Sequence, residues 1–241
     1  MKKITLLFIL LASWLLLSSC SPASSGFAAI AQDVTTATND RRSPGELIDD
    51  NNIYRKLNNI LKNDSMLENS HISFLVYDKS ALMLGEAPTA DAVDYLEKQI
   101  KKNIPLLNQL INEVVVEKNS SYVSRAKDGI ISTQIETLFL NQEVFHPNHI
   151  LFKTERQVVY LMGAVTKREA EHATNVVSKA KNVNQIAKLF DILTVRPASE
   201  IERDNLKYAK EQKIVELEAK KRQLELEQNN VILQLDALLY E

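Results

Sequence analysis

The middle of the sequence repeats itself at a constant offset of 78 residues, and this repeat limits the possible folds more than any other feature. The matched pairs are Asp50–Asp128, Ile53–Ile131, Leu57–Ile135, Ile60–Leu138, Leu61–Phe139, Asn63–Asn141, His71–His149, Ile72–Ile150, Phe74–Phe152, Gly85–Gly163 and Ala92–Ala170. Chance readily matches apolar residues, but it does not readily match Asp, Asn, His and Gly in the same register. We therefore expect two copies of one domain, over residues 46–117 and 124–196.

Each copy begins with the spacing of an amphipathic helix. Ile53, Leu57, Ile60 and Leu61 lie on one helical stripe, and their counterparts in the second copy keep the same spacing. Two strands follow, at 72–77 and 81–84 in the first copy and at 150–152 and 158–162 in the second, each pair joined by a polar turn. A second helix is expected at 90–102 and 167–181, and a last strand at 111–117 and 187–195.

The expected order of elements is therefore αββαβ, twice, which is an α+β fold with helices packed on a small three-stranded sheet. Gly85 and Gly163 are expected to end the second strand of each copy, where the chain must turn or approach another backbone closely.

The second copy resembles a known family. Residues 158–170, VVYLMGAVTKREA, are similar to the central signature of the BON domain: an apolar strand, a glycine, a valine, a polar turn and an alanine-containing helix. Val183 and Ile186 are similar to the paired apolar positions before the family's last strand. The first copy departs from the pattern at Gly85-Glu86-Ala87, which lacks the glycine-valine ending. The resemblance implies association with anionic phospholipid, a role in envelope integrity, and no catalysis.

The N-terminus has the pattern of a bacterial lipoprotein signal. Lys2 and Lys3 precede an apolar stretch, residues 4–17, that is too short to span a bilayer. Leu17-Ser18-Ser19-Cys20 then resembles a lipobox, so residues 1–19 are expected to be cleaved and Cys20 to carry lipid. The alternative is an ordinary signal peptide with an incidental cysteine. Ser21 stands where the retention signal of the inner membrane would place Asp, which favours the periplasmic face of the outer membrane. Together, the lipobox and the two repeats resemble the dual-BON outer-membrane lipoproteins of the DolP type.

Composition limits the remaining possibilities. Residues 20–45 are rich in Ser, Ala, Thr and Asn and are expected to form a disordered, lipidated linker. Loss of the two signal-peptide lysines leaves 27 basic and 31 acidic residues, a net charge of −4, which argues against a nucleic-acid partner. Cys20 is the only cysteine, so no disulfide is available.

The sequence shows no enzyme motif. It contains no G-x-S-x-G elbow, no Walker loop and no dinucleotide fingerprint, and only five glycines. His146 and His149 are three residues apart, but Pro147 and Asn148 between them indicate a turn and no carboxylate motif accompanies them. We therefore expect no catalysis, no metal site and no cofactor.

A surface for lipid is expected on the first helix of the second copy, residues 125–140, because the resemblance places the family's lipid contact there. Ile130 and Leu140 lie off the core stripe and are candidates for contact with acyl chains, with Arg125 and Lys127 as candidates for contact with head groups. Ile130 stands where lipid-binding relatives carry Trp, so the aromatic interfacial anchor is missing. The alternative is a helix that packs only on its own domain and on the other copy.

Residues 199–241 are expected to form one long helix, because they contain no Gly or Pro and are rich in Glu, Lys, Leu and Gln. A heptad seam gives the candidates for self-association: Ile214, Leu217, Leu224, Val231, Leu235 and Leu238. Lys221 and Gln228 interrupt this seam, and Leu226 and Leu233 belong to a second apolar series on another side. The alternative is a solvated helix that frays.

Three functions are compatible with these features. The preferred one is a non-enzymatic envelope lipoprotein that binds anionic phospholipid or a membrane partner. The second is an oligomeric scaffold that uses the C-terminal coiled coil to assemble with itself or with a larger envelope complex. The third is an enzyme accessory or small-ligand sensor with a cleft between the two sheets, which the absence of converging polar groups in the sequence argues against.

Overall fold

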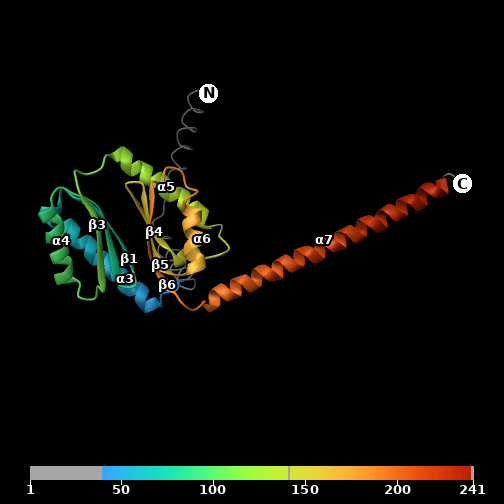
Figure 1. Cartoon of the computed structure of the whole chain (residues 1–241), viewed down its shortest axis with the longest axis horizontal. Helices are drawn as coiled ribbons and strands as arrows, with labels where there is room; N and C mark the ends of the chain where they lie inside the picture. The colour runs from blue at the N-terminus through green and yellow to red at the C-terminus, as the bar shows by residue number, and fades with distance from the viewer. Residues whose placement is uncertain (1–39, 141, 240–241) are drawn as a thin grey trace, which may run out of the picture.

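The computed structural model describes residues 40–140 and 142–239. It contains two α+β units followed by one long helix that projects away from them (Figure 1). The predicted signal peptide, Cys20 and the first part of the linker lie outside the described residues. Within the described part, no helix is both long enough and apolar enough to cross a bilayer.

The first unit consists of α3 (Pro44–Asn63), the short 3-10 turn η1 (Ser65–Leu67), β1 (His71–Tyr77), β2 (Ser80–Ala87), α4 (Ala90–Asn103) and β3 (Gln109–Val116). The second consists of α5 (Tyr122–Leu140), η2 (Pro147–His149), β4 (Leu151–Glu155), β5 (Val158–Thr166), α6 (Lys167–Val177) and β6 (Gln185–Leu193). The predicted order αββαβ is therefore confirmed for both copies. The long helix α7 (Ala198–Leu239) ends the described chain.

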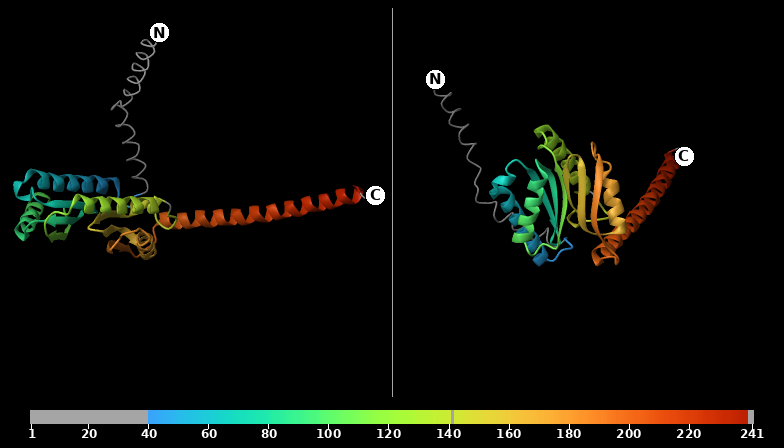
Figure 2. Two further views of the ribbon diagram at one scale, coloured as in Figure 1. Left: turned by 90° about the horizontal axis from the view of Figure 1, so that it is seen from above. Right: turned by 60° about the vertical axis from the view of Figure 1, so that its left-hand side comes forward.

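Both sheets have the same topology. The first two strands of each pair antiparallel, and the third pairs with the second in parallel, after the crossover through α4 or α6. The two sheets lie next to each other in the middle of the folded body. The helices of each unit cover the outer side of that unit's sheet (Figures 1 and 2). Leu82 and Leu84 are fully buried but lie outside the first unit's own core cluster, on the opposite face of β2, which the second unit covers.

The matched aspartates explain why the repeat holds the same structure twice. The hairpin turn of the first unit places Asp78 and Lys79 at positive φ, and their backbone N–H groups donate to the Asp50 carboxylate at 2.9 and 2.7 Å. In the second unit the N–H groups of Arg156 and Gln157 donate to Asp128 in the same way, at 3.0 and 2.8 Å. Each buried Asp therefore anchors the first helix to a type of turn that few residues other than Gly adopt freely.

The prediction that Gly85 and Gly163 end their strands is wrong. β2 continues to Ala87 and β5 to Thr166, and both glycines are paired within the sheet. The glycines are needed because the neighbouring strand approaches closely: a Cβ on Gly85 would lie 1.9 Å from the carbonyl oxygen of His71, and one on Gly163 would lie 2.2 Å from that of His149. The second helix of the second unit is also shorter than predicted, since α6 ends at Val177 rather than near residue 181.

The predicted linker over residues 20–45 enters the described structure at its last six residues. Residues 40–43 lie against both units, and α3 begins at Pro44, with Ser43 as the N-cap of a capping box completed by Glu46. This end of the linker is therefore part of the folded body. Two consecutive arginines, Arg41 and Arg42, hold this segment in place by pairing with buried carboxylates in different units.

Candidate functional site

Helix α5 has apolar side chains on two sides. Ile131, Ile135 and Phe139 face the core of the second unit and are buried. Ile130 and Leu140, the candidates for lipid contact, are 59% and 74% exposed. They belong to an uncharged exposed stripe that runs the whole length of the helix and is called the α5 stripe below: Tyr122, Val123, Ala126, Ile130, Thr133, Thr137 and Leu140.

The charges of α5 lie beside this stripe rather than on it. Arg125 donates to the carbonyl of Ser120 at 3.1 Å and its guanidinium lies 5.4 Å from the ring centre of Tyr122, at one end of the stripe. Lys127 is exposed. Asp128 is buried and accepts the hairpin N–H groups described above. Arg125 and Lys127 therefore provide the positive charge near the start of the α5 stripe, whereas Glu136 is an exposed acid further along the helix.

Two arginines at the end of the linker hold the two units together, and we call them the arginine clasp. Arg41 donates from both guanidinium ends to the carboxylate of Glu169 on α6, at 2.8 Å each, and also to the carbonyl of Ala164 at 2.7 Å. Arg42 pairs with Asp50 on α3 at 2.8 Å and lies over the ring of Tyr77 at 4.5 Å. Neither arginine was recognised from the sequence, because the surrounding residues have the composition of a linker.

Glu169 is the buried centre of the second unit's share of this network. Its carboxylate is fully buried and also lies 3.5 Å from Nδ1 of His149. Burial alone would raise the pKa of Glu169, but contacts with His149 and Arg41 and the N–H of Thr166 outweigh burial and lower the pKa to about 2. Glu169 therefore remains ionised and serves structure, as the third residue of the α6 capping box.

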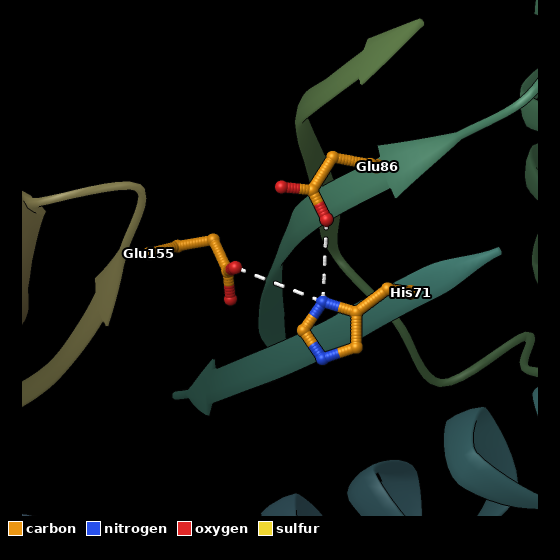
Figure 3. Close-up of side chains that lie close together, drawn as sticks. All are labelled: His71, Glu86 and Glu155. Carbon is orange, nitrogen blue, oxygen red and sulfur yellow. Dashed lines mark ion pairs between the residues drawn. The ribbon is translucent and has the colours of Figure 1, made fainter. Parts of the chain in front are cut away.

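A second cluster of ionisable groups joins the units at the other end of the sheets. Nδ1 of His71 lies 3.3 Å from a carboxylate oxygen of Glu86 and 3.7 Å from one of Glu155 (Figure 3). Burial, together with the carboxylates of Glu86 and Asp128, raises the pKa of Glu155 to about 7. Sequence reasoning took His71 only as the start of a strand. Nothing in the spacing of the three residues could indicate that they meet, because Glu155 comes from the other unit.

The structure does not turn His146 and His149 toward a common point. Their ring centres are 5.7 Å apart, but Nδ1 of His146 accepts the N–H of Asn148 whereas Nδ1 of His149 faces Glu169. His149 is buried and ends the η2 turn, two residues before β4. Burial, with the charges of His149 and Arg203, lowers the pKa of His146. His146 and His149 therefore line the surface next to Arg41.

Two segments of the sequence match the family model of the BON domain, at residues 49–118 and 127–194. The chain belongs to the BON domain family. The matched ranges cover most of the two predicted copies, so the predicted dual-BON organisation is confirmed. The family's first helix corresponds to α3 in one domain and to α5 in the other.

Two named proteins are similar in sequence to this chain. The chain is 27% identical over 188 residues to "Outer membrane lipoprotein DolP" of Haemophilus influenzae, which covers 78% of this chain and 95% of that protein. It is 24% identical over 153 residues to "21 kDa hemolysin" of Actinobacillus pleuropneumoniae, covering 63% of this chain and 78% of that one. Among solved structures, CdsD, a structural protein of the type III secretion system of Chlamydia trachomatis, matches 65% of this chain and 68% of its own at 12% identity and a TM-score of 0.24. Such a low score supports no inference.

Helix α7 follows the second BON domain and is fixed to it only at its beginning. Glu200 is 1% exposed and lies within 3.4 Å of Arg168 and 3.2 Å of Arg196, and Asp204 pairs with the same two arginines. Hydrogen bonds to Arg168 and Arg196 lower the pKa of Asp204 to about 2. Arg203 donates to the carbonyl of Val144 at 2.7 Å.

The rest of α7 extends away from both BON domains (Figures 1 and 2). Five of the six seam candidates are exposed: Ile214, Leu217, Leu224, Val231 and Leu235. The side chain of Leu238 falls outside the described ones. At about 1.5 Å per residue, the 42-residue helix is roughly 63 Å long. Within one chain, its apolar seam therefore has no described partner.

Proposed function

We propose that this BON protein is a non-enzymatic lipoprotein on the periplasmic face of the outer membrane, where it binds anionic phospholipid and supports envelope integrity. The observation that carries the proposal is the α5 stripe. Seven exposed, uncharged side chains in one line, with Arg125 and Lys127 beside its start, suit a helix lying along a negatively charged bilayer surface. The name of the Haemophilus relative and the lipobox-like residues 17–20 support the location.

Attachment to the membrane is proposed to depend on Cys20. Because the chain has no other cysteine, Cys20→Ala should abolish incorporation of a fatty-acid probe during growth, while the folded domains keep their thermal transition. Labelled protein is separated by electrophoresis and compared with the unsubstituted protein. Label of equal intensity on the Cys20→Ala chain would show that the lipobox interpretation is wrong.

Binding of the α5 stripe to lipid is tested by Ile130→Asp with Leu140→Asp in residues 21–241. Both side chains are exposed, so the double variant should fold normally, but two added carboxylates should reduce sedimentation with phosphatidylglycerol-containing vesicles at least about tenfold. Sedimentation with phosphatidylcholine vesicles should be weak for both proteins.

The matched control places the same charges on the other domain. Ile48 and Val116 are also exposed apolar residues, and Ile48→Asp with Val116→Asp should leave vesicle binding unchanged. Equal binding by the α5 double variant and the unsubstituted protein would reject the α5 stripe as the contact with lipid. So would equal losses in the two double variants.

A second candidate function, an oligomeric scaffold, is favoured by the exposed seam of α7. A helix with this seam gains about 1.5–3 kcal/mol for each leucine it fully buries, and the heptad spacing suits a partner helix of the same sequence. Residues 21–241 should therefore form a dimer or trimer, whereas residues 21–198 should be monomeric. Leu224→Asp with Val231→Asp should convert the longer protein to a monomer without unfolding the BON domains.

Sedimentation equilibrium over a hundredfold range of concentration measures this change. Gln223→Asp with Asn230→Asp is the matched control, because it adds the same charges one residue before each seam position and should leave the oligomer intact. A monomer at all concentrations for residues 21–241 would contradict self-association and leave a different envelope protein as the partner of α7.

A further inference from the structure

Three ligand-bearing side chains converge where the two BON domains meet. His71 is the first residue of β1, Glu86 is the next-to-last residue of β2, and Glu155 is the last residue of β4 (Figure 3). His71 and Glu86 are directly opposite each other in the antiparallel ladder, so the sheet itself holds their side chains together. Glu155 immediately precedes the hairpin turn that Asp128 anchors. All three therefore project from rigid elements.

The polar atoms in this cluster lack the partners that burial normally requires. Glu86 is 1% exposed, and its Oε2 is buried without a hydrogen bond, as is Nδ1 of His71. Among the described residues, no Lys or Arg forms an ion pair with either Glu86 or Glu155. Two ionised carboxylates that face each other across an interface, with an imidazole between them, favour a cation at that point.

The distances suit a divalent metal ion. One nitrogen and two carboxylate oxygens, one from each residue, all lie within 4.8 Å of one another. Ligand atoms of a tetrahedral Zn²⁺ ion are about 3.4 Å apart, given metal–ligand bonds of about 2.1 Å. The two contacts of Nδ1, at 3.3 and 3.7 Å, are close to that value. Among the described residues, no other group of His, Cys, Asp and Glu meets this condition.

We propose that His71, Glu86 and Glu155 bind a divalent ion of the first transition row, such as Zn²⁺, which links the two BON domains. An imidazole ligand favours these ions over Mg²⁺ and Ca²⁺, which prefer oxygen ligands only. The fourth position is open to water, because His71 and Glu155 also line a neighbouring cavity of about 420 Å³. The ion neutralises both carboxylates and fixes one domain against the other.

The internal repeat strengthens the proposal, because the two domains differ at these positions. At the offset of 78 residues, Glu86 corresponds to Ala164 and Glu155 corresponds to Tyr77. His71 corresponds to His149, which contacts Glu169 of its own domain instead. Neither domain alone therefore holds the three ligands. They come together only when one copy contributes two and the other contributes the third.

Titration calorimetry of the full protein, purified in non-ionic detergent and stripped of metal with a chelator, tests the site with ZnCl₂ at pH 7.5. We expect one Zn²⁺ per chain and weak or no binding of MgCl₂. Loss of a residue that only hydrogen-bonds to a metal ligand costs about 10–100-fold in metal affinity. Loss of a ligand itself should cost more, so His71→Ala and Glu155→Gln should each weaken Zn²⁺ binding at least about 100-fold. Glu155→Gln keeps the side-chain shape, which guards against unfolding as the cause.

His146→Ala is the matched control. It removes a histidine that is not one of the proposed ligands, so Zn²⁺ affinity should be unchanged. Zn²⁺ should also raise the Tm of the unsubstituted protein and of His146→Ala, but not that of Glu155→Gln. Three results would overturn the proposal: no stoichiometric binding by the folded protein, unchanged affinity in both ligand variants, or a loss as large in His146→Ala. The first of these would mean that the cluster holds no metal ion.

Discussion

Gly85→Ala should destabilise the protein by about 3–5 kcal/mol. The added Cβ would lie 1.9 Å from the carbonyl oxygen of His71 and 3.2 Å from the Cα of Ile72, so it would meet backbone rather than a movable side chain. Gly85 also has a φ of 118°, which other residues rarely adopt. Backbone strain and overpacking each cost about 1–3 kcal/mol. Denaturant unfolding of residues 21–241, followed by circular dichroism, measures the change.

Gly129→Ala provides the matched control for the same chemical change. Gly129 lies inside α5, and nothing would come within 4 Å of its added Cβ. Because Ala is favoured over Gly in a helix interior by up to about 1 kcal/mol, this variant should be as stable as the unsubstituted protein or more so. If Gly85→Ala unfolded at the same denaturant concentration as Gly129→Ala, the close approach of β1 and β2 would not be as described.

Glu169→Gln should cost about 3 kcal/mol, because it leaves Arg41 and His149 facing a neutral group inside the protein. Gln can still accept the N–H of Thr166, so the capping box survives and the variant isolates the charge. Removal of one member of a buried ion pair costs about 3–5 kcal/mol in other proteins. The lower end applies here, because the Arg41 side chain keeps 10% exposure and its bond to Ala164.

The difference in free energy of unfolding between Glu169→Gln and the unsubstituted protein should depend on pH. The pKa of Glu169 is about 2 in the folded chain, against 4.5 for an ordinary Glu, so between these values the folded state binds fewer protons than the unfolded state. The contribution of Glu169 to stability is therefore complete above about pH 5 and is lost as the pH falls toward 2. Urea unfolding at pH 7, 5 and 3 should show the two curves converging.

Glu171→Gln, on the exposed side of the same helix, controls for the substitution itself. Its partner Lys167 is 4.0 Å away and both side chains are in solvent, so stability should hardly change at any of the three pH values. A constant difference between Glu169→Gln and the unsubstituted protein from pH 7 to pH 3 would mean that Glu169 is not held in its ionised form by the arginine clasp.

Much of the fold was predictable because the repeat carries structural information at its polar positions. The matched Asp50 and Asp128 are the anchors of two equivalent turns, and the matched glycines are positions where a neighbouring backbone leaves no room for a Cβ. The expectation that the glycines end their strands was wrong, whereas the expected close approach to another backbone was right. In the sequence of one strand, a glycine suggests that the strand ends. Only the pairing with the neighbouring strands shows that the strand continues through it.

The functional surfaces were predictable to different extents, for a physical reason. The exposure of Ile130 and Leu140 follows from helix geometry, which depends only on residues within the same element. The arginine clasp and the cluster of His71, Glu86 and Glu155 depend on how two domains are placed against each other. No local pattern contains that placement, so a linker-like sequence concealed Arg41 and Arg42, and His71 was taken only as a strand residue.

The arginine clasp also determines how a mechanical load would enter the molecule. Tension on an anchored N-terminus would reach the folded body at two neighbouring residues, Arg41 and Arg42, each of which holds a different BON domain. The pull would be divided between the second domain, through Glu169 on α6 and Ala164 on β5, and the first domain, through Asp50 on α3. If Cys20 carries lipid, as proposed, the chain from Cys20 to Arg41 could span at most about 75 Å. Both domains would therefore be restrained together within that radius of the bilayer.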